Sequence, residues 1–284
     1  MMRGLRQIFP SNVIDTLSLC YALLLIHSVV IFGDFFVAPW MKEHYGTTDA
    51  QILLYNVYGG FVYLNVMGNI WKIMTTNTST IGKILPTLLK PGWQYCAVCE
   101  ANAPPRSFHC RTCNRCILKR DHHCMFTGKC IGYFNHRYYI CLIGYTWLGA
   151  MFASTYCMGF TWTVLGEFSF FNLLCFVFPL FLLLFGMLDF YTAIICLLTL
   201  VATLFWGILT FLMAWHSKHI IYNLTTHERR HNIFFYNLGW RENIKHIFGC
   251  KWYICWLFPW ISSPLPGDGM SFPTSGNFEN PKDQ

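Results

Sequence analysis

Charged residues are scarce in this chain: Asp, Glu, Lys and Arg together make up only 12% of its 284 residues. Soluble domains carry about 25% charged residues, so the sequence is not that of an ordinary soluble domain. Hydrophobic residues, at 55%, are too abundant for a disordered chain. The class that remains is an integral membrane protein that crosses the bilayer several times.

Four apolar stretches are long enough to cross a membrane, which takes about 20 mainly apolar residues. They are Thr16–Val37, Ile52–Ile73, Tyr138–Trp162 and Tyr191–Trp215. A fifth stretch, residues 168–188, is also apolar but is interrupted by Pro179. Asp15, Asp34 and His27 lie in or beside the first stretch, where ionisable side chains are functional candidates, although Asp15 and Asp34 are close enough to its ends to reach water.

The placement of basic residues predicts the orientation of the chain. Lys and Arg are absent between Tyr138 and Trp215 but occur on both sides of that stretch and before the first span. Cytosolic loops carry the excess of basic residues, so the N-terminus, the segment between the second and third spans and the C-terminal region are expected in the cytosol. This orientation needs an even number of crossings in the basic-free stretch, so residues 168–188 are expected to be re-entrant or interfacial. Glycosylation sequons at Asn77 and Asn223 would then be cytosolic and unused.

Seven of the 14 cysteines are crowded into residues 96–130, together with three histidines. Cys and His at short spacing indicate metal binding rather than disulfides. The pattern C-x2-C-x9-H-x6-C occurs twice, the second copy 14 residues after the first, and we expect one structural zinc ion on each copy. The ligands are Cys96, Cys99, His109 and Cys116 in the first set, and Cys110, Cys113, His123 and Cys130 in the second. A single zinc ion with spare thiols, or another pairing of these ligands, is the alternative.

Two potential ligands, His122 and Cys124, are left over from this assignment, and Asp121 precedes them. A thiol is a nucleophile only as the thiolate, and a neighbouring imidazole can take its proton. A carboxylate can fix the tautomer of that imidazole, as in other Asp-His-nucleophile arrangements. The three residues are therefore candidates for covalent catalysis, and the alternative is that they are the remainder of a purely structural zinc ribbon.

Asp121-His122-His123-Cys124, placed in this cysteine-rich frame between two pairs of spans, resembles the signature of the DHHC protein S-acyltransferase (palmitoyltransferase) family. The resemblance extends to the family's TTxE motif and, more loosely, to an asparagine of its C-terminal element; these residues are Thr225, Thr226, Glu228 and Asn243. It implies that Cys124 is acylated from a fatty acyl-CoA, that His122 is the base and that Asp121 orients it. The zinc ligands that it implies are the two sets derived above.

The chain departs from the family pattern in two places. Met125 and Phe126 follow the motif where family members commonly have Pro-Trp, and Lys129 stands where they commonly have Asn. The resemblance implies acyl-CoA as co-substrate, two structural zinc ions, membrane-associated protein substrates with cytosolic cysteines and a place in the endomembrane system, in the ER or Golgi. Residues that could contact acyl-CoA are Met125, Phe126, Lys129, Arg229 and Arg230. A catalytically weak or silent zinc scaffold in the membrane is the alternative function, and nucleic-acid binding is not expected.

The expected fold is therefore an all-α polytopic membrane protein with four transmembrane helices and a cytosolic two-zinc module between the second and third. The expected parts are a cytosolic N-terminus (1–15), transmembrane helices 1 and 2 (16–73), the zinc module (74–137), transmembrane helices 3 and 4 (138–215), a cytosolic C-terminal region (216–261) and a disordered tail (262–284).

Overall fold

The computed structural model describes residues 8–84, 87 and 90–275. The chain forms two compact units. The first comprises Met1–Ala22, Asn65–Leu142 and Ala214–Gln284, and it contains every residue that the sequence predicts for catalysis or metal binding. The second comprises Leu23–Leu64 and Ile143–Met213, and it is made only of helices and their connections.

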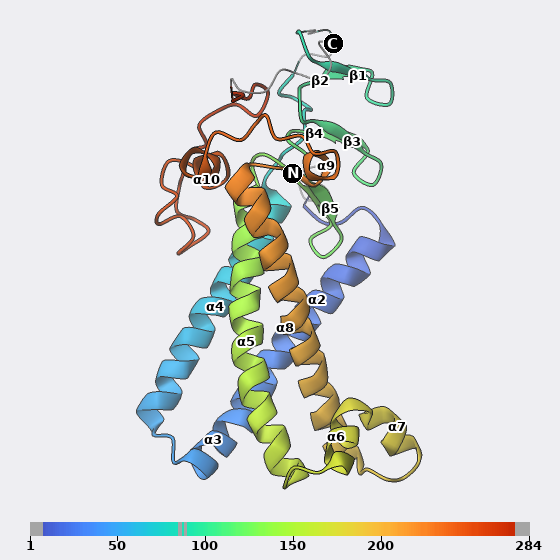
Figure 1. Cartoon of the computed structure of the whole chain (residues 1–284), viewed down its shortest axis with the longest axis vertical. Coiled ribbons are helices and arrows are strands. Elements are labelled where there is room, and N and C mark those ends of the chain that lie inside the picture. Colours follow the sequence, from blue (N-terminus) through green and yellow to red (C-terminus); the bar gives the residue numbers. More distant parts are fainter. Residues whose placement is uncertain (1–7, 85–86, 88–89, 276–284) are drawn as a thin grey trace. The chain divides into compact units, whose positions relative to one another are not determined.

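Most of the described chain is helical (Figure 1). The helical elements are α2 (Val13–Phe32), the π-helical turn η1 (Gly33–Val37), α3 (Ala38–Tyr45), α4 (Asp49–Thr75), α5 (His136–Leu165), α6 (Phe170–Val177), α7 (Pro179–Leu184), α8 (Phe190–Tyr222), α9 (Thr226–Arg230) and α10 (Trp240–Phe248). Among the described residues, three helical stretches are long and apolar enough to cross a membrane: Val13–Tyr45, His136–Leu165 and Phe190–Tyr222.

Two expected membrane segments differ from these three stretches. Helix α4 covers the second expected span and has 27 residues, but Asn65 and Asn69 make it less apolar than the other long helices. The apolar stretch 168–188 forms α6 and α7, of eight and six residues, and neither could cross a bilayer by itself. Pro179 begins α7, because proline is tolerated in the first turn of a helix but not in its interior.

Hydrogen bonds join the helices of the second unit. The hydroxyl groups of Thr161 on α5 and Thr199 on α8 lie 2.7 Å apart, and the Trp147 indole donates to Thr210 Oγ1 at 2.8 Å. Between α2 and α4, the Tyr63 hydroxyl lies 2.9 Å from His27 Nε2. Polar pairs of this kind contribute about 0.6 to 2 kcal/mol each between helices in a bilayer, where water does not compete.

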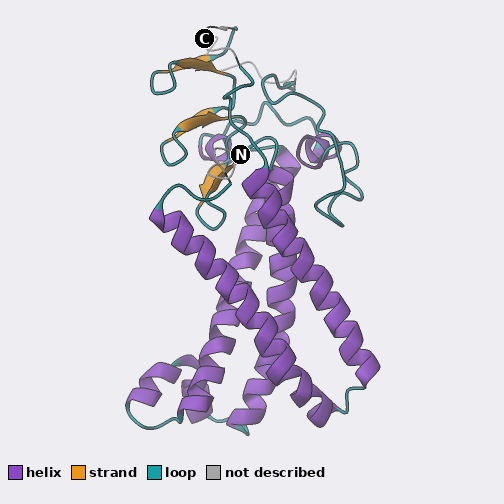
Figure 2. Ribbon diagram, turned by 180° about the vertical axis from the view of Figure 1, so that it is seen from behind, coloured by secondary structure: helices purple, strands orange, loops and turns teal. Residues whose placement is uncertain are grey.

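The segment between α4 and α5 is not helical, so the all-α expectation does not hold there. It forms three two-stranded antiparallel hairpins, which Figure 2 shows as three separate pairs of short strands. The strands are β1 (Gln94–Cys96), β2 (Ala101–Ala103), β3 (Phe108–Cys110), β4 (Arg115–Ile117), β5 (His122–Cys124) and β6 (Lys129–Ile131). Successive hairpins begin 14 residues apart, which is the shift that relates the two ligand patterns in the sequence.

The turns of the three hairpins also repeat. Glu100, Asn114 and Gly128 occupy equivalent positions, and all three have a positive φ, between 48° and 61°. A left-handed residue at that position closes the turn, and glycine or asparagine adopts it at the lowest cost. The three hairpins are therefore copies of one structural unit, of which the sequence pattern had revealed only two.

The C-terminal residues 262–275, which were expected to be disordered, contact other parts of the first unit. Gly267 N donates to the Tyr133 hydroxyl at 3.1 Å, the ring of Phe272 packs edge-on against Tyr133, and Ser275 N donates to Phe235 O at 2.8 Å. The remainder of the expected tail, residues 276–284, lies outside the described residues.

Candidate active site and metal centres

Two groups of three cysteines and one histidine have their ligand atoms within 4.8 Å of one another. These groups are the two predicted sets: Cys96, Cys99, His109 and Cys116, and Cys110, Cys113, His123 and Cys130. In both sets the histidine presents Nδ1 to the sulfur atoms, as in the 3.2 Å separation from Cys99 Sγ to His109 Nδ1 and the 3.4 Å separation from Cys113 Sγ to His123 Nδ1. Three thiolates and one imidazole nitrogen form the donor set of a structural tetrahedral zinc site, so the residues fit the metal.

Each set joins two successive hairpins. The Cys-x2-Cys pair comes from the turn of one hairpin, and the other two ligands come from the middle of the next. His109 and Cys116 are direct cross-strand partners in the second hairpin, and His123 and Cys130 are partners in the third. This linkage explains why the two patterns overlap in the sequence.

The turn of the third hairpin has no metal set among the described residues. Cys124 occupies the position that a ligand cysteine holds in the first two turns, and Thr127 occupies that of the second cysteine. No fourth hairpin follows, because the chain continues into α5 at His136. Cys124 is therefore a buried turn cysteine for which the described fold provides no zinc partners.

Strand alternation places His122 and Cys124 on one face of β5 and His123 on the other. His122 Nδ1 donates to Asp121 Oδ2 at 2.6 Å, and a hydrogen bond joins His122 to the Cys124 thiol. Asp121 is buried, whereas the His122 side chain is 27% exposed. The three predicted catalytic residues thus form one hydrogen-bonded chain, open to solvent at its histidine.

The electrostatics of this chain favour a thiolate and an imidazolium. Burial raises the pKa of the Cys124 thiol, but hydrogen bonding and charge interaction with His122 outweigh it, so the pKa is lowered overall. Burial would lower the pKa of His122, but its hydrogen bonds to Asp121 and Cys124 raise it to about 9. Burial opposes the Asp121 charge, yet the bond from His122 holds the pKa of that carboxyl below its usual range. An ion pair of this kind activates a cysteine nucleophile.

The TTxE residues hold the other side of Asp121. Thr226 donates to both carboxylate oxygens of Asp121, from its backbone N at 2.8 Å and from Oγ1 at 3.1 Å. Thr225 and Glu228 form a capping box at the start of α9, each side chain accepting from the backbone N–H of the other. Glu228 also accepts two hydrogen bonds from Arg106, at 2.6 and 2.7 Å, and both side chains are at most 4% exposed.

Asn243 joins helix α10 to neighbouring parts of the C-terminal region, and none of its hydrogen bonds within the described chain reaches a residue predicted for catalysis. Its side chain donates to Ile221 O at 2.6 Å and accepts from Leu238 N at 3.0 Å, which ties α10 to the end of α8. Nearby, the buried Lys119 Nζ donates to Asn223 Oδ1 at 2.7 Å. These contacts hold the C-terminal region against the hairpins.

The residues expected to contact acyl-CoA fall into two groups. Met125 and Phe126 follow Cys124 in the third turn and are 44% and 49% exposed, so they present an apolar surface beside the thiol. The Arg229 guanidinium lies over the Trp215 ring, 3.5 Å from its centroid, and Lys129 Nζ donates to Phe9 O at 3.5 Å. Arg230 is exposed at the end of α9.

Two contacts at the site involve residues for which no role there was predicted. Asp15, at the start of α2, accepts from His123 Nε2 at 2.9 Å and is buried. His216 and His219, near the end of α8, lie beside Asp121. Asp15 precedes one apolar run and the two histidines end another, and no spacing links these residues to a motif 92 or more residues away. Only the fold reveals these contacts.

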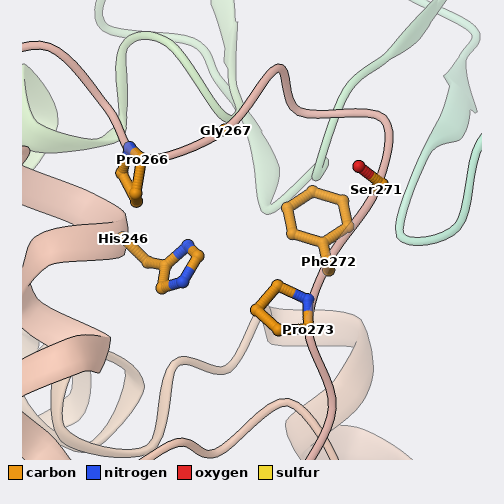
Figure 3. A pocket seen from close by; sticks show the side chains of 6 residues that line it. All are labelled: His246, Pro266, Gly267, Ser271, Phe272 and Pro273. Carbon is orange, nitrogen blue, oxygen red and sulfur yellow. The ribbon is translucent and has the colours of Figure 1, made fainter.

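A cavity of about 440 Å³ lies elsewhere in the first unit. Figure 3 shows its lining, with the His246 ring on one side and Phe272 and Pro273 on the other. None of the residues predicted for catalysis or zinc binding lines it, so it is separate from the candidate active site.

Comparison with known proteins decides the family. The family model for DHHC palmitoyltransferases matches residues 90–233. The chain belongs to the DHHC palmitoyltransferase family. A zebrafish (Danio rerio) protein named probable palmitoyltransferase ZDHHC24 is 33% identical over 245 residues, 86% of this chain and 82% of the relative. The mouse (Mus musculus) and human (Homo sapiens) proteins of the same name are 32% and 31% identical over 75% and 76% of this chain.

Membership of the DHHC family identifies the chain as a protein S-acyltransferase, an integral membrane enzyme with a cysteine-rich zinc-binding module. The matched segment contains both ligand sets, the DHHC residues and the TTxE motif.

Proposed function

We propose that Cys124 carries the fatty acyl group from acyl-CoA to cysteine side chains of membrane-associated proteins. The observation that supports this most strongly is the continuous hydrogen-bonded chain from Thr226 through Asp121 and His122 to a cysteine without metal partners among the described residues. A structural zinc ribbon would have no need to keep one turn cysteine free of metal and paired with a histidine instead.

In the first step, His122 Nε2 takes the thiol proton of Cys124, and Sγ attacks the thioester carbonyl carbon of acyl-CoA. The tetrahedral intermediate expels CoA, whose sulfur recovers the proton from His122 and leaves as the free thiol. In the second step, the substrate thiol gives its proton to His122 and attacks the acyl group on Cys124, which is released as a thiol. This sequence predicts ping-pong kinetics.

Asp121 keeps the proton of His122 on Nδ1, so that Nε2 faces the thiol, and Thr226 keeps Asp121 in place. Zinc, where bound, supplies rigid tetrahedral coordination and takes no part in the acyl transfer. Since His123 belongs to the second ligand set and lies between His122 and Cys124 in β5, its coordination would fix the backbone of both neighbours.

The fatty chain and the CoA phosphates of the substrate each match a different surface near Cys124. A fatty chain gains about 0.8 kcal/mol for each buried methylene, and the exposed Met125 and Phe126 offer it an apolar path. Lys129, Arg229 and Arg230 are the proposed contacts of the CoA phosphates. We also propose four membrane crossings that include α4, a cytosolic zinc module and termini, and a place in the ER or Golgi membrane.

The decisive experiment is intact-mass analysis of the zinc-loaded protein in detergent after incubation with palmitoyl-CoA. Wild type should gain one hydroxylamine-labile acyl adduct, which Cys124→Ser should abolish and His122→Ala should slow about 100-fold or more, as expected for loss of a general base. Cys250→Ser removes an exposed cysteine outside the site and should acylate normally.

An adduct that persists in Cys124→Ser, or no adduct with any acyl chain length from folded protein, would overturn the proposal. The second outcome would make the zinc scaffold the better description of this chain.

A further inference from the structure

Three buried side chains form a group outside the two cysteine sets. One ligand atom each of Asp121, His216 and His219 lies within 4.8 Å of the others, and all three residues are buried. His216 and His219 are spaced i, i+3, which places them on one face of α8. The group contains two imidazoles and one carboxylate.

The histidines of this group are short of hydrogen bonds. His219 has no hydrogen-bond partner on either ring nitrogen among the described residues, and His216 has none on Nδ1. The other nitrogen of His216 lies 3.2 Å from the Tyr139 hydroxyl. Buried polar atoms without a partner are rare in folded proteins, and each calls for a ligand or another explanation.

The spacing suits a metal ion better than a direct bond. His219 Nδ1 lies 3.8 Å from Asp121 Oδ1, which is too long for a hydrogen bond. Two ligand atoms on one zinc ion, each about 2.0–2.2 Å from it at tetrahedral angles, are separated by about 3.4 Å. Two imidazoles and one carboxylate form a donor set for Zn²⁺ and similar transition-metal ions.

We propose that Asp121, His216 and His219 form a third metal site, for a divalent transition-metal ion, and that its occupancy inhibits acyl transfer. Asp121 also accepts from His122, so a dication on the same carboxylate withdraws charge from the group that orients and stabilises the catalytic imidazolium. The site differs from the two structural ones because it contains no thiolate. The inhibitory part of this inference rests on the proposed function, and metal binding itself does not.

A competing metal site must be excluded in the test. His227 on α9 and His231, which follows the last residue of that helix, stack at 4.2 Å between ring centroids, an i, i+4 pair that could bind a transition metal at the surface. The double variant His227→Gln/His231→Gln is therefore the matched control for His216→Gln and His219→Gln.

The experiment adds Co²⁺ to protein that already holds two equivalents of zinc. We expect wild type and the His227→Gln/His231→Gln control to bind one further equivalent, seen as cobalt d–d absorption without thiolate-to-cobalt charge-transfer bands. His216→Gln and His219→Gln should each weaken this binding at least tenfold while retaining two zinc ions, which shows that they are folded.

The second readout is acyl-adduct formation at Cys124. A third equivalent of Zn²⁺ should slow it in wild type and in the control, and His219→Gln should be resistant. No third equivalent in wild type, or a third equivalent lost only in the α9 control, would overturn the proposal. Normal metal binding without any acylation in metal-free buffer would instead count against the proposed function and against inhibition, and leave the site itself supported.

Discussion

At the scale of single residues, the candidate nucleophile differs from its structural counterparts by what stands three positions after it. In each of the first two turns a second metal-binding cysteine stands at this position, whereas Thr127 stands there after Cys124. The Thr127 hydroxyl donates to the carbonyl of Cys124 at 3.3 Å, and the same side chain helps to lower the pKa of the Cys124 thiol. Thr127 thus stands in place of a zinc ligand and also contributes to activating the thiol.

We therefore predict that Thr127→Val slows acylation of Cys124 by about tenfold, because a hydrogen bond to a charged group contributes about 1.5 kcal/mol and each 1.36 kcal/mol is a factor of ten in rate. The measurement is the single-turnover rate of acyl-adduct formation with palmitoyl-CoA. Thr127→Ser keeps the hydroxyl and should retain most of the rate. Equal rates in Thr127→Val and wild type would show that the hydroxyl does not act on the thiol.

Asp15 is a second residue whose role is local. Its carboxylate accepts from His123 Nε2 while His123 Nδ1 faces the sulfur atoms of the second set, an arrangement that fixes the tautomer and orientation of a metal-binding histidine. We predict that Asp15→Asn weakens the second zinc site by about 10- to 100-fold, as is usual when such a partner is lost.

The measurement for Asp15→Asn is the rate at which a colorimetric chelator removes zinc. One of the two equivalents should leave faster than in wild type, and the other should not change. Asp49→Asn is the control, because Asp49 is 88% exposed and its ion pair is with the exposed Lys42. Equal release from Asp15→Asn and Asp49→Asn would rule out the role assigned to Asp15.

At the scale of secondary-structure elements, the sequence reveals ligand sets more readily than the units that carry them. The 14-residue shift was visible because Cys and His repeat at identical positions in two copies. The third copy was hidden, because Thr127 replaces its second cysteine and helix α5 begins where further ligands would lie. Three-residue strands with no alternating apolar pattern leave no periodic signal, so the hairpins themselves could not be predicted.

Helix α9 contacts the hairpin segment at two places, through Glu228 to Arg106 and through Thr226 to Asp121. Its capping box was predictable from T-x-x-E, but its buried partner was not, since Arg106 lies 122 residues away in the chain. The pairing of Arg106 with Glu228 fixes the start of α9, and with it the Thr226 groups that hold Asp121.

We predict that Glu228→Gln lowers the stability of the first unit by about 3 kcal/mol, because it leaves the buried Arg106 charge without its carboxylate. Thermal unfolding of the zinc-loaded protein should show a lower midpoint, and acylation should fall because Asp121 loses its support. Glu242→Gln breaks the exposed pair with Lys245 and should change stability by less than about 1 kcal/mol. Similar midpoints for the two variants would contradict the structural role of the buried pair.

At the scale of the whole molecule, composition and charge distribution predict a number of membrane crossings, which the helices alone do not determine. Three described stretches are apolar enough to span a membrane, and α4 has the length of a fourth despite its asparagines. The proposed even number of crossings therefore depends on α4 crossing and on α6 and α7 not crossing. Length and hydropathy cannot decide this, because neighbouring helices can satisfy polar residues such as Asn65 and Asn69.

Glycosylation mapping in ER membranes tests this topology. We predict that the native sequons at Asn77 and Asn223 stay unmodified, because both would face the cytosol, and that a sequon built into a Gly/Ser insertion between Gly186 and Asp189 is modified. Asn223 is also buried, and its side chain forms hydrogen bonds with Lys119 and Tyr236, so Asn77 is the more informative native site.

The readout is the mass shift removed by an N-glycosidase. An insertion that stays unmodified together with a modified Asn77 would reverse the orientation. Modification at both places would require an even number of crossings between Asn77 and the insertion, so that either α6 and α7 cross together with α5 or α5 does not cross. Because Cys124 lies in the same loop as Asn77, either result would place Cys124 on the luminal side, away from cytosolic acyl-CoA.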